Sequence, residues 1–184
     1  MAARFLSQPV CDRLDLVADP VREVIQKWST AEWIREVKVA EIDPVHAGGA
    51  DLCEHYGLDI RTGGNCVLVK SKRGAQIRKA ACLVPVATRA DLNGLVKRTL
   101  GARQVSLLAH QDAVAESRME YGSITVIGLP EEWPVLVDST LAEAKEVTIG
   151  SGRVNAKLQL PGFALVAMTS ALVLEGLGDP ATAP

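Results

Sequence analysis

The stretch Gly122-Ser123-Ile124-Thr125-Val126-Ile127-Gly128-Leu129-Pro130 decides how this chain is interpreted, because it combines bounding glycines with hydroxyl and apolar side chains. Glycine lets a ligand approach backbone N–H groups closely, and such groups can bind a carbonyl oxygen or stabilise an oxyanion. A glycine-bounded hairpin loop is at least as common as a binding loop. The stretch is therefore a candidate ligand cradle that needs support from the residues around it.

Polar residues follow this stretch at the end of a predicted strand. Asp138 and Ser139 come directly after the apolar run Val135 to Val137, where a carboxylate or hydroxyl often faces a cleft. The alternative, favoured by the sequence alone, is that one of them caps the next helical turn. Gly150 and Ser151 similarly form either a simple turn or a second wall of the same pocket. Because no serine here lies in a nucleophile elbow, a serine hydrolase is disfavoured.

The bulk composition is that of one ordinary globular domain. The chain has 184 residues, of which 48% are hydrophobic and 23% charged. No stretch approaches about 18 consecutive apolar residues, and the first ten residues lack a signal-peptide core. The four cysteines form no CxxC pair. We expect a soluble cytoplasmic protein that does not enter a membrane, with no metal and no cofactor.

Positive charge is concentrated in the middle of the chain. Residues 61–110 carry ten Lys and Arg residues against the single acid Asp91, although the net charge of the whole chain is −2. Clustered basic side chains of this kind contact nucleic-acid phosphates, and a solvated protein face is an equally good explanation. Aromatic residues make up only 4%, so contact with RNA backbone or one terminal nucleotide is expected. The candidate tRNA-binding residues are Lys70, Lys72, Arg73, Arg78 and Lys79.

Periodicity predicts alternating helices and strands. Helices are predicted at 20–28, 46–56, 91–100, 111–117, 141–144 and 161–168. Gly57 is expected to end the second of them, and Asp91 supplies a capping group for the third. Strands are predicted at 37–42, 66–70, 79–87, 105–109, 135–137, 146–149 and 157–160. The strands at 66–70 and 79–87 form a hairpin, and the tail from Gly178 to Pro184 is expected to fray.

The order of these features resembles the YbaK and prolyl-tRNA synthetase-associated editing domain family. The motifs that carry the resemblance are Ala90-Asp91-Leu92, Leu100-Gly101-Ala102, Gly122 to Pro130, Pro134 to Asp138 and Gly150 to Leu160. It implies an α/β (α+β) fold with a mixed, partly barrel-like sheet surrounded by helices. It also implies an N-terminal extension over residues 1–50 packed on an editing domain over 51–177, followed by the tail 178–184, in one structural domain.

The resemblance implies hydrolysis of the ester of a mischarged aminoacyl-tRNA by a free-standing protein. The catalytic residues would be Gly122, Ser123, Thr125 and Asp138, with the loop binding the aminoacyl carbonyl and Asp138 on the opposite wall. The substrate-binding residues would be Asn65, Ile124, Val126, Gly128, Ser139, Gly150 and Ser151. The tRNA acceptor end is the implied partner, and a prolyl-tRNA synthetase is a candidate protein partner.

Two positions depart from the family pattern. Asn65 stands where the family usually has a lysine, and Val126 stands where its loop generally has proline. Lys70 cannot take the place of the lysine, because five residues along a strand lead to its opposite face. These departures favour a second hypothesis, a non-catalytic module that binds an aminoacyl-tRNA end or a protein.

Overall fold

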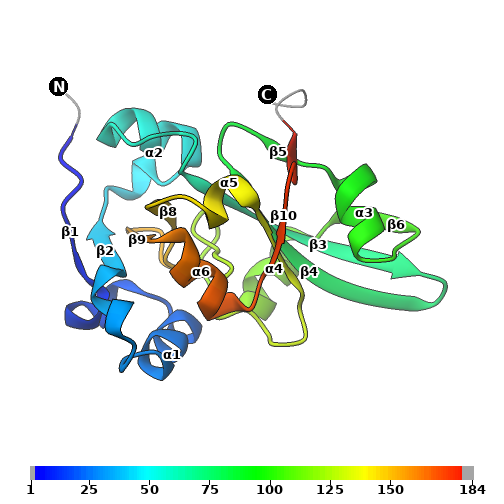
Figure 1. Cartoon of the computed structure of the whole chain (residues 1–184), viewed down its shortest axis with the longest axis horizontal. Coiled ribbons are helices and arrows are strands. Elements are labelled where there is room, and N and C mark those ends of the chain that lie inside the picture. The colour runs from blue at the N-terminus through cyan, green and yellow to red at the C-terminus, as the bar shows by residue number, and fades with distance from the viewer. Residues whose placement is uncertain (1–2, 180–184) are drawn as a thin grey trace.

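The computed structural model describes residues 3–179 and contains two main β-sheets with helices around them (Figure 1). One sheet has the order β1 (Ser7–Pro9), β2 (Lys38–Glu41), β9 (Ala156–Leu160), β8 (Val147–Gly150). The other has the order β10 (Leu172–Leu174), β7 (Val135–Asp138), β4 (Gln76–Pro85), β3 (Gly64–Arg73), β6 (Gln104–Leu107). This confirms the mixed α+β class, and within the described residues the strands do not close into a barrel.

The two sheets meet at the beginning of β3. An isolated parallel bridge joins Gly63, just before β3, to Thr148 of β8. The β3–β4 hairpin runs in register from Gly64 opposite Pro85 to Arg73 opposite Gln76, and its tip extends away from the other sheet (Figure 1). A third, two-stranded sheet pairs β11 (Gly178–Asp179) with β5 (Arg89–Ala90). The predicted fraying is therefore wrong for residues 178–179, and residues 180–184 lie outside the described residues.

The helices lie close to the predicted positions. They are α1 (Asp19–Lys27), α2 (Gly49–Tyr56), α3 (Lys97–Thr99), α4 (His110–Ser117), α5 (Ser139–Ala142) and α6 (Gly162–Thr169). Short 3₁₀ turns are η1 (Val10–Asp12), η2 (Leu14–Leu16), η3 (Glu32–Glu36) and η4 (Pro44–His46). Gly57 ends α2 in a left-handed conformation with φ 66°, as its position predicted. No helix of residues 3–179 is long and apolar enough to cross a membrane.

The helix predicted after Asp91 has a different geometry from the expected one. Its first turn, η5 (Leu92–Val96), is a π-helix that continues into α3. The Asp91 carboxylate accepts hydrogen bonds from Gly94 N at 2.8 Å and Leu95 N at 2.7 Å, which confirms its capping role. Such a wide turn is a local insertion that hydrophobic periodicity does not reveal.

Residues before position 50 form part of the main core. Val39 of β2 lies opposite Leu158 of β9, and both are fully buried together with Ile149 of β8. A second apolar cluster covers the other face of the β3–β4 hairpin and includes Val69 and Cys82. Both faces of the hairpin base are therefore packed, which fixes β3 and the junction between the two sheets.

The Asp138 carboxylate connects three elements at the end of β7. One oxygen accepts a hydrogen bond from Thr140 N at 2.9 Å and so caps α5, as the capping alternative predicted. The other oxygen accepts from Gly178 N at 2.8 Å, which anchors β11. The Asp138 side chain is buried. If its carboxylate were removed, water would not readily replace it as the acceptor for these two N–H groups.

We predict that Asp138→Ala lowers the free energy of unfolding by about 2–4 kcal/mol, because two hydrogen bonds to a buried carboxylate are lost. Urea unfolding followed by circular dichroism measures this change. Asp112→Ala, at an exposed position of α4, is the matched control and should change stability by less than about 0.5 kcal/mol. Equal stability of the two variants would contradict the anchoring role.

Candidate functional site

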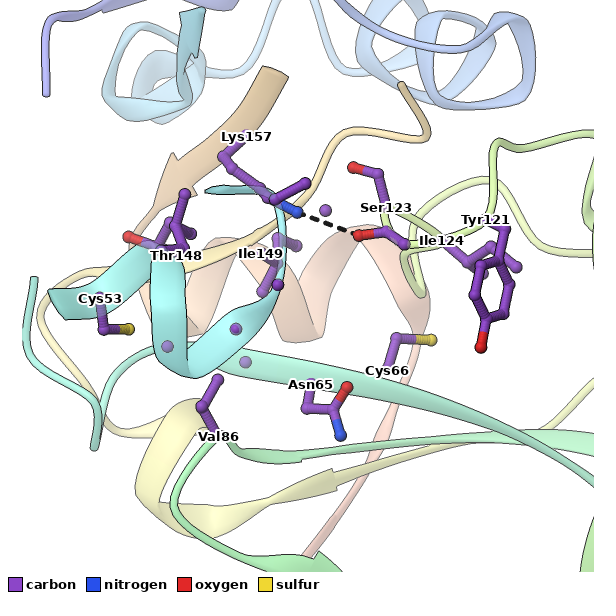
Figure 2. Close-up of a pocket in the computed structure, with 18 residues that line it drawn as sticks. Cys53, Asn65, Cys66, Val86, Tyr121, Ser123, Ile124, Thr148, Ile149 and Lys157 are labelled. Carbon is purple, nitrogen blue, oxygen red and sulfur yellow. Dashed lines mark hydrogen bonds between the residues drawn. The ribbon is translucent and has the colours of Figure 1, made fainter. Parts of the chain in front are cut away.

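A pocket of about 280 Å³ lies where the two sheets meet (Figure 2). Its walls come from the start of α2, the start of β3, the end of β8, the middle of β9 and the loop that begins at Tyr121. The lining residues are Ala47, Gly48, Gly49, Leu52, Cys53, Gly63, Gly64, Asn65, Cys66, Val86, Tyr121, Gly122, Ser123, Ile124, Thr148, Ile149, Gly150 and Lys157. Glycine is frequent in these walls, so much of the surface offered to a ligand is backbone.

Gly150 allows the loop to lie directly on β8. A Cβ atom at this position would lie 2.3 Å from the Ser123 carbonyl oxygen and 2.9 Å from that of Ile124. Real side chains do not approach backbone oxygens so closely, and only glycine leaves the necessary space. The residue identity at position 150 therefore sets the distance between the loop and the sheet.

Hydrogen bonds hold most of the loop's polar groups. Ser123 N donates to Glu120 O at 3.1 Å, and Gly152 N donates to Ser123 O at 2.8 Å. The Ser123 hydroxyl accepts from Ser151 N at 3.3 Å. Within residues 3–179 the backbone N–H groups of Tyr121, Gly122 and Ile124 have no acceptor, and all three residues line the pocket, so these amides are available to a ligand.

Lys157 of β9 lies in the pocket, although its position in the sequence predicted only the beginning of a strand. Its ammonium donates to the Gly122 carbonyl oxygen at 3.3 Å, and Figure 2 shows the side chain reaching from β9 toward the loop. The residue is only 5% exposed, and burial lowers the pKa of the ammonium to about 8. Among the described residues no carboxylate forms an ion pair with it.

A signal for Lys157 was present in the sequence. The strand Ala156-Lys157-Leu158-Gln159-Leu160 alternates polar and apolar residues, which normally indicates a solvated face. In the structure all five residues of β9 are buried, so both faces of the strand are covered. The two polar residues of the alternating pattern, Lys157 and Gln159, therefore lie inside the protein rather than on its surface.

The structure brings five of the predicted substrate and catalytic residues together in the pocket: Gly122, Ser123, Ile124, Asn65 and Gly150. It does not bring the others there, namely Thr125, Val126, Gly128, Asp138, Ser139 and Ser151. Asp138, expected on the opposite wall, does not line the pocket, and its two oxygens accept hydrogen bonds from α5 and β11.

The second half of the loop is part of the protein interior. Thr125 and Val126 are buried, and the Thr125 hydroxyl has no hydrogen-bond partner within residues 3–179. Gly128 has φ 83°, and a Cβ there would lie 2.5 Å from the carbonyl carbon of Pro20. Ser151 donates to Ala156 O at 3.0 Å. These residues position the ligand-facing half of the loop without lining the pocket.

Other titratable side chains of the pocket are uncharged at neutral pH or lie at its rim. Burial raises the pKa of the Cys53 and Cys66 thiols, which disfavours the nucleophilic thiolate. Tyr121 is 65% exposed at the rim and packs edge-on against His110, with ring centroids 4.0 Å apart. Among residues 3–179, neither a histidine nor a carboxylate lines the pocket.

The predicted tRNA-binding residues lie on the β3–β4 hairpin. Lys70, Lys72, Arg73 and Arg78 are exposed, and no ion pair within the described residues includes them. Lys79 differs, because Glu116 pairs with it and the Trp133 ring centroid lies 5.7 Å from its Nζ. At about 3.3 Å per strand residue, the hairpin tip lies roughly 25 Å from the pocket.

Comparisons with known proteins identify a sequence family and similar folds. A sequence model described as an aminoacyl-tRNA editing domain matches residues 43–168. Among solved structures, a proposed trans-editing enzyme for prolyl tRNA synthetase is similar with a TM-score of 0.72 and 19% identity, over 89% of this chain and 99% of that one. The hypothetical protein APE2540 is similar with a TM-score of 0.74 and 22% identity, over 88% and 100%. No curated protein matches the chain.

The two structural similarities show the shared fold, and the sequence match extends across α2, both walls of the pocket and the loop between them. The match includes more than half of the chain. The protein therefore belongs to the aminoacyl-tRNA editing domain family.

Proposed function

We propose that this chain, acting as a free-standing protein, hydrolyses the ester of a tRNA mischarged with a small amino acid. The observation that carries the proposal is the glycine-walled pocket lined by a loop whose amides, including that of Ile124, have no acceptor within residues 3–179. A backbone donor held in place can polarise an ester carbonyl without any protein nucleophile. The membership of the editing domain family supports the same chemistry.

The proposed reaction uses water as the nucleophile. A water oxygen forms a bond to the ester carbonyl carbon, and the carbonyl oxygen becomes an oxyanion that accepts a hydrogen bond from Ile124 N–H. The bond from this carbon to the ribose oxygen then breaks, and the ribose oxygen takes up a proton that originates from the attacking water. The products are the free amino acid and an uncharged tRNA, and the neighbouring ribose hydroxyl orients the water.

The size of the pocket supports selectivity for a small side chain. A volume of about 280 Å³ lies at or below the lower limit typical of sites that enclose drug-sized ligands, and it has to accommodate the aminoacyl group beside the ribose. Ile124, Val86 and Leu52 supply apolar walls. Larger aminoacyl groups would be excluded by these walls, which is how size-selective sites discriminate.

The binding-module hypothesis stays a second candidate, and Asn65 is the observation that favours it. Asn65 is exposed at the pocket and can donate a hydrogen bond, but it carries no charge. A module that only binds would retain affinity for an aminoacylated end without releasing the amino acid.

We predict that the protein releases the amino acid from tRNA carrying alanine, cysteine or serine faster than from tRNA carrying leucine or phenylalanine. Release of radiolabelled amino acid, corrected for hydrolysis in buffer, measures the rates. Saturable binding with no release above buffer for every tRNA in the panel would support the binding module and contradict the deacylase.

We predict that Gly150→Ala reduces this release by at least about 10-fold, because the new Cβ displaces the Ser123–Ile124 backbone from its place over β8. The far-ultraviolet circular dichroism spectrum establishes that the variant is folded. Full activity in a folded variant would show that the placement of the loop is unimportant for hydrolysis.

We predict that Lys72→Ala and Arg73→Ala together weaken tRNA binding and make the slope of log K against log salt smaller by about 1–2, because phosphate contacts at the hairpin are lost. Filter binding at several salt concentrations measures both quantities. Lys27→Ala with Arg35→Ala is the matched control, since both residues are exposed on α1 and η3. Equal effects of the two pairs would exclude the hairpin as the tRNA-binding surface.

A further inference from the structure

Lys157 is a buried cation that forms no ion pair with a carboxylate of residues 3–179. It lies on the central strand β9, opposite Ala40 of β2 on one side and Gly150 of β8 on the other. The absence of a side chain on Gly150 leaves room over β8 for the loop that Lys157 contacts. Transfer of an ammonium from water into such a site is costly unless a negative group compensates it. A ligand that acquires negative charge in the pocket would provide that compensation.

The ammonium retains hydrogen-bonding capacity toward the pocket. An ammonium has three N–H donors, and within residues 3–179 the Gly122 carbonyl oxygen is its hydrogen-bond acceptor. That bond connects Lys157 to the same loop whose Ile124 amide is free. Lys157 lines the pocket from the β9 side, while Asn65 and Cys66 lie on the β3 side (Figure 2).

We propose that the Lys157 ammonium and the Ile124 N–H together form the oxyanion site of the pocket, with Lys157 as a catalytic residue. This inference rests on the proposed deacylase function. When water adds to the ester carbon, the electrons of the C=O π bond move to the oxygen, and the resulting charge lies beside the ammonium. When the bond to the ribose oxygen breaks, the charge leaves this oxygen and the carbonyl re-forms. Lys157 keeps its proton throughout, and its contribution is electrostatic.

The depth of Lys157 favours an oxyanion over a tRNA phosphate as its partner. A phosphodiester is charged before the reaction and would have to lose its hydration to reach a side chain that is 5% exposed. An ester is neutral when it binds and becomes negative only in the transition state. Lys157 should therefore bind the transition state more strongly than the substrate, which raises kcat and leaves KM nearly unchanged.

The kinetic test uses Lys157→Met, which removes the charge but keeps a long side chain. We expect kcat to fall on the order of 100-fold with KM changed less than about threefold, as for the loss of an oxyanion donor. Lys157→Arg should recover a substantial part of kcat. Lys145→Met, at an exposed position before β8, is the matched control and should behave like the wild type. A rise in KM with unchanged kcat would assign Lys157 to phosphate binding and overturn the proposal.

The pH profile separates a catalytic from a merely structural lysine. Because the protonated form acts, kcat/KM should decrease above pH 8, the region of the lowered Lys157 pKa, after subtraction of buffer hydrolysis. Lys157→Arg should shift this decrease to higher pH. The same profile for both proteins would overturn the proposal.

Several other titratable groups lie near Lys157 or on the elements that adjoin it. Cys53, Cys66 and Tyr121 line the same pocket, and the pKa values of the two thiols are raised. Glu41 on the adjoining β2 is exposed and lies 4.0 Å from Arg13. Glu120 beside the loop is exposed and accepts from Val154 N at 2.6 Å.

A binding experiment distinguishes failure of this inference from failure of the proposed function. The probes are the alanyl phosphonate monoester of adenosine, which carries a negative tetrahedral oxygen, and 3′-alanylamino-3′-deoxyadenosine, which is neutral at the carbonyl. Calorimetry should show that Lys157→Met weakens phosphonate binding at least about 10-fold and amide binding less than twofold. Hydrolysis by the wild type with equal phosphonate binding by both proteins would overturn the Lys157 assignment alone. Lys157-dependent phosphonate binding without hydrolysis of any aminoacyl-tRNA would overturn the deacylase and keep the anion site.

Discussion

The close contact between the Ser123–Ile124 backbone and Gly150 is the constraint on which the rest of the site depends. A side chain at position 150 would lie within 2.3 Å of a carbonyl oxygen, so the loop can rest on β8 only over glycine. Its cross-strand neighbour Lys157 then reaches the Gly122 carbonyl. The lack of a side chain at Gly150 thus determines where the loop lies and allows the Lys157 ammonium to contact it.

The two sheets give this contact a rigid support. The bridge between Gly63 and Thr148 brings β3 and β8 together, and α2 closes the remaining side of the pocket. The buried half of the loop, including Val126 and Ile127, packs into the main core. A backbone donor and an ammonium held in this way need little rearrangement as charge develops on a substrate, and such preorganisation is the main source of electrostatic catalysis.

Local sequence patterns predicted the helices and strands well, but they did not predict which polar side chains are buried. The hairpin, the Asp91 cap and the Gly57 helix end follow from residue types and their spacing. Lys157 was missed because its strand alternates like a solvated one, whereas in the structure all five residues of β9 are buried. Asp138 was placed in the site by resemblance, whereas β11, formed by residues close to the C-terminal end, takes one of its oxygens. Burial of this kind depends on contacts between distant segments, which a local pattern does not contain.

A crystal structure with 3′-alanylamino-3′-deoxyadenosine tests the central claim most directly. The account predicts that the aminoacyl carbonyl oxygen lies about 3 Å from both Ile124 N and Lys157 Nζ, with the alanyl side chain against the apolar walls. A carbonyl oxygen bound on the β3 side near Asn65, away from both donors, would contradict it.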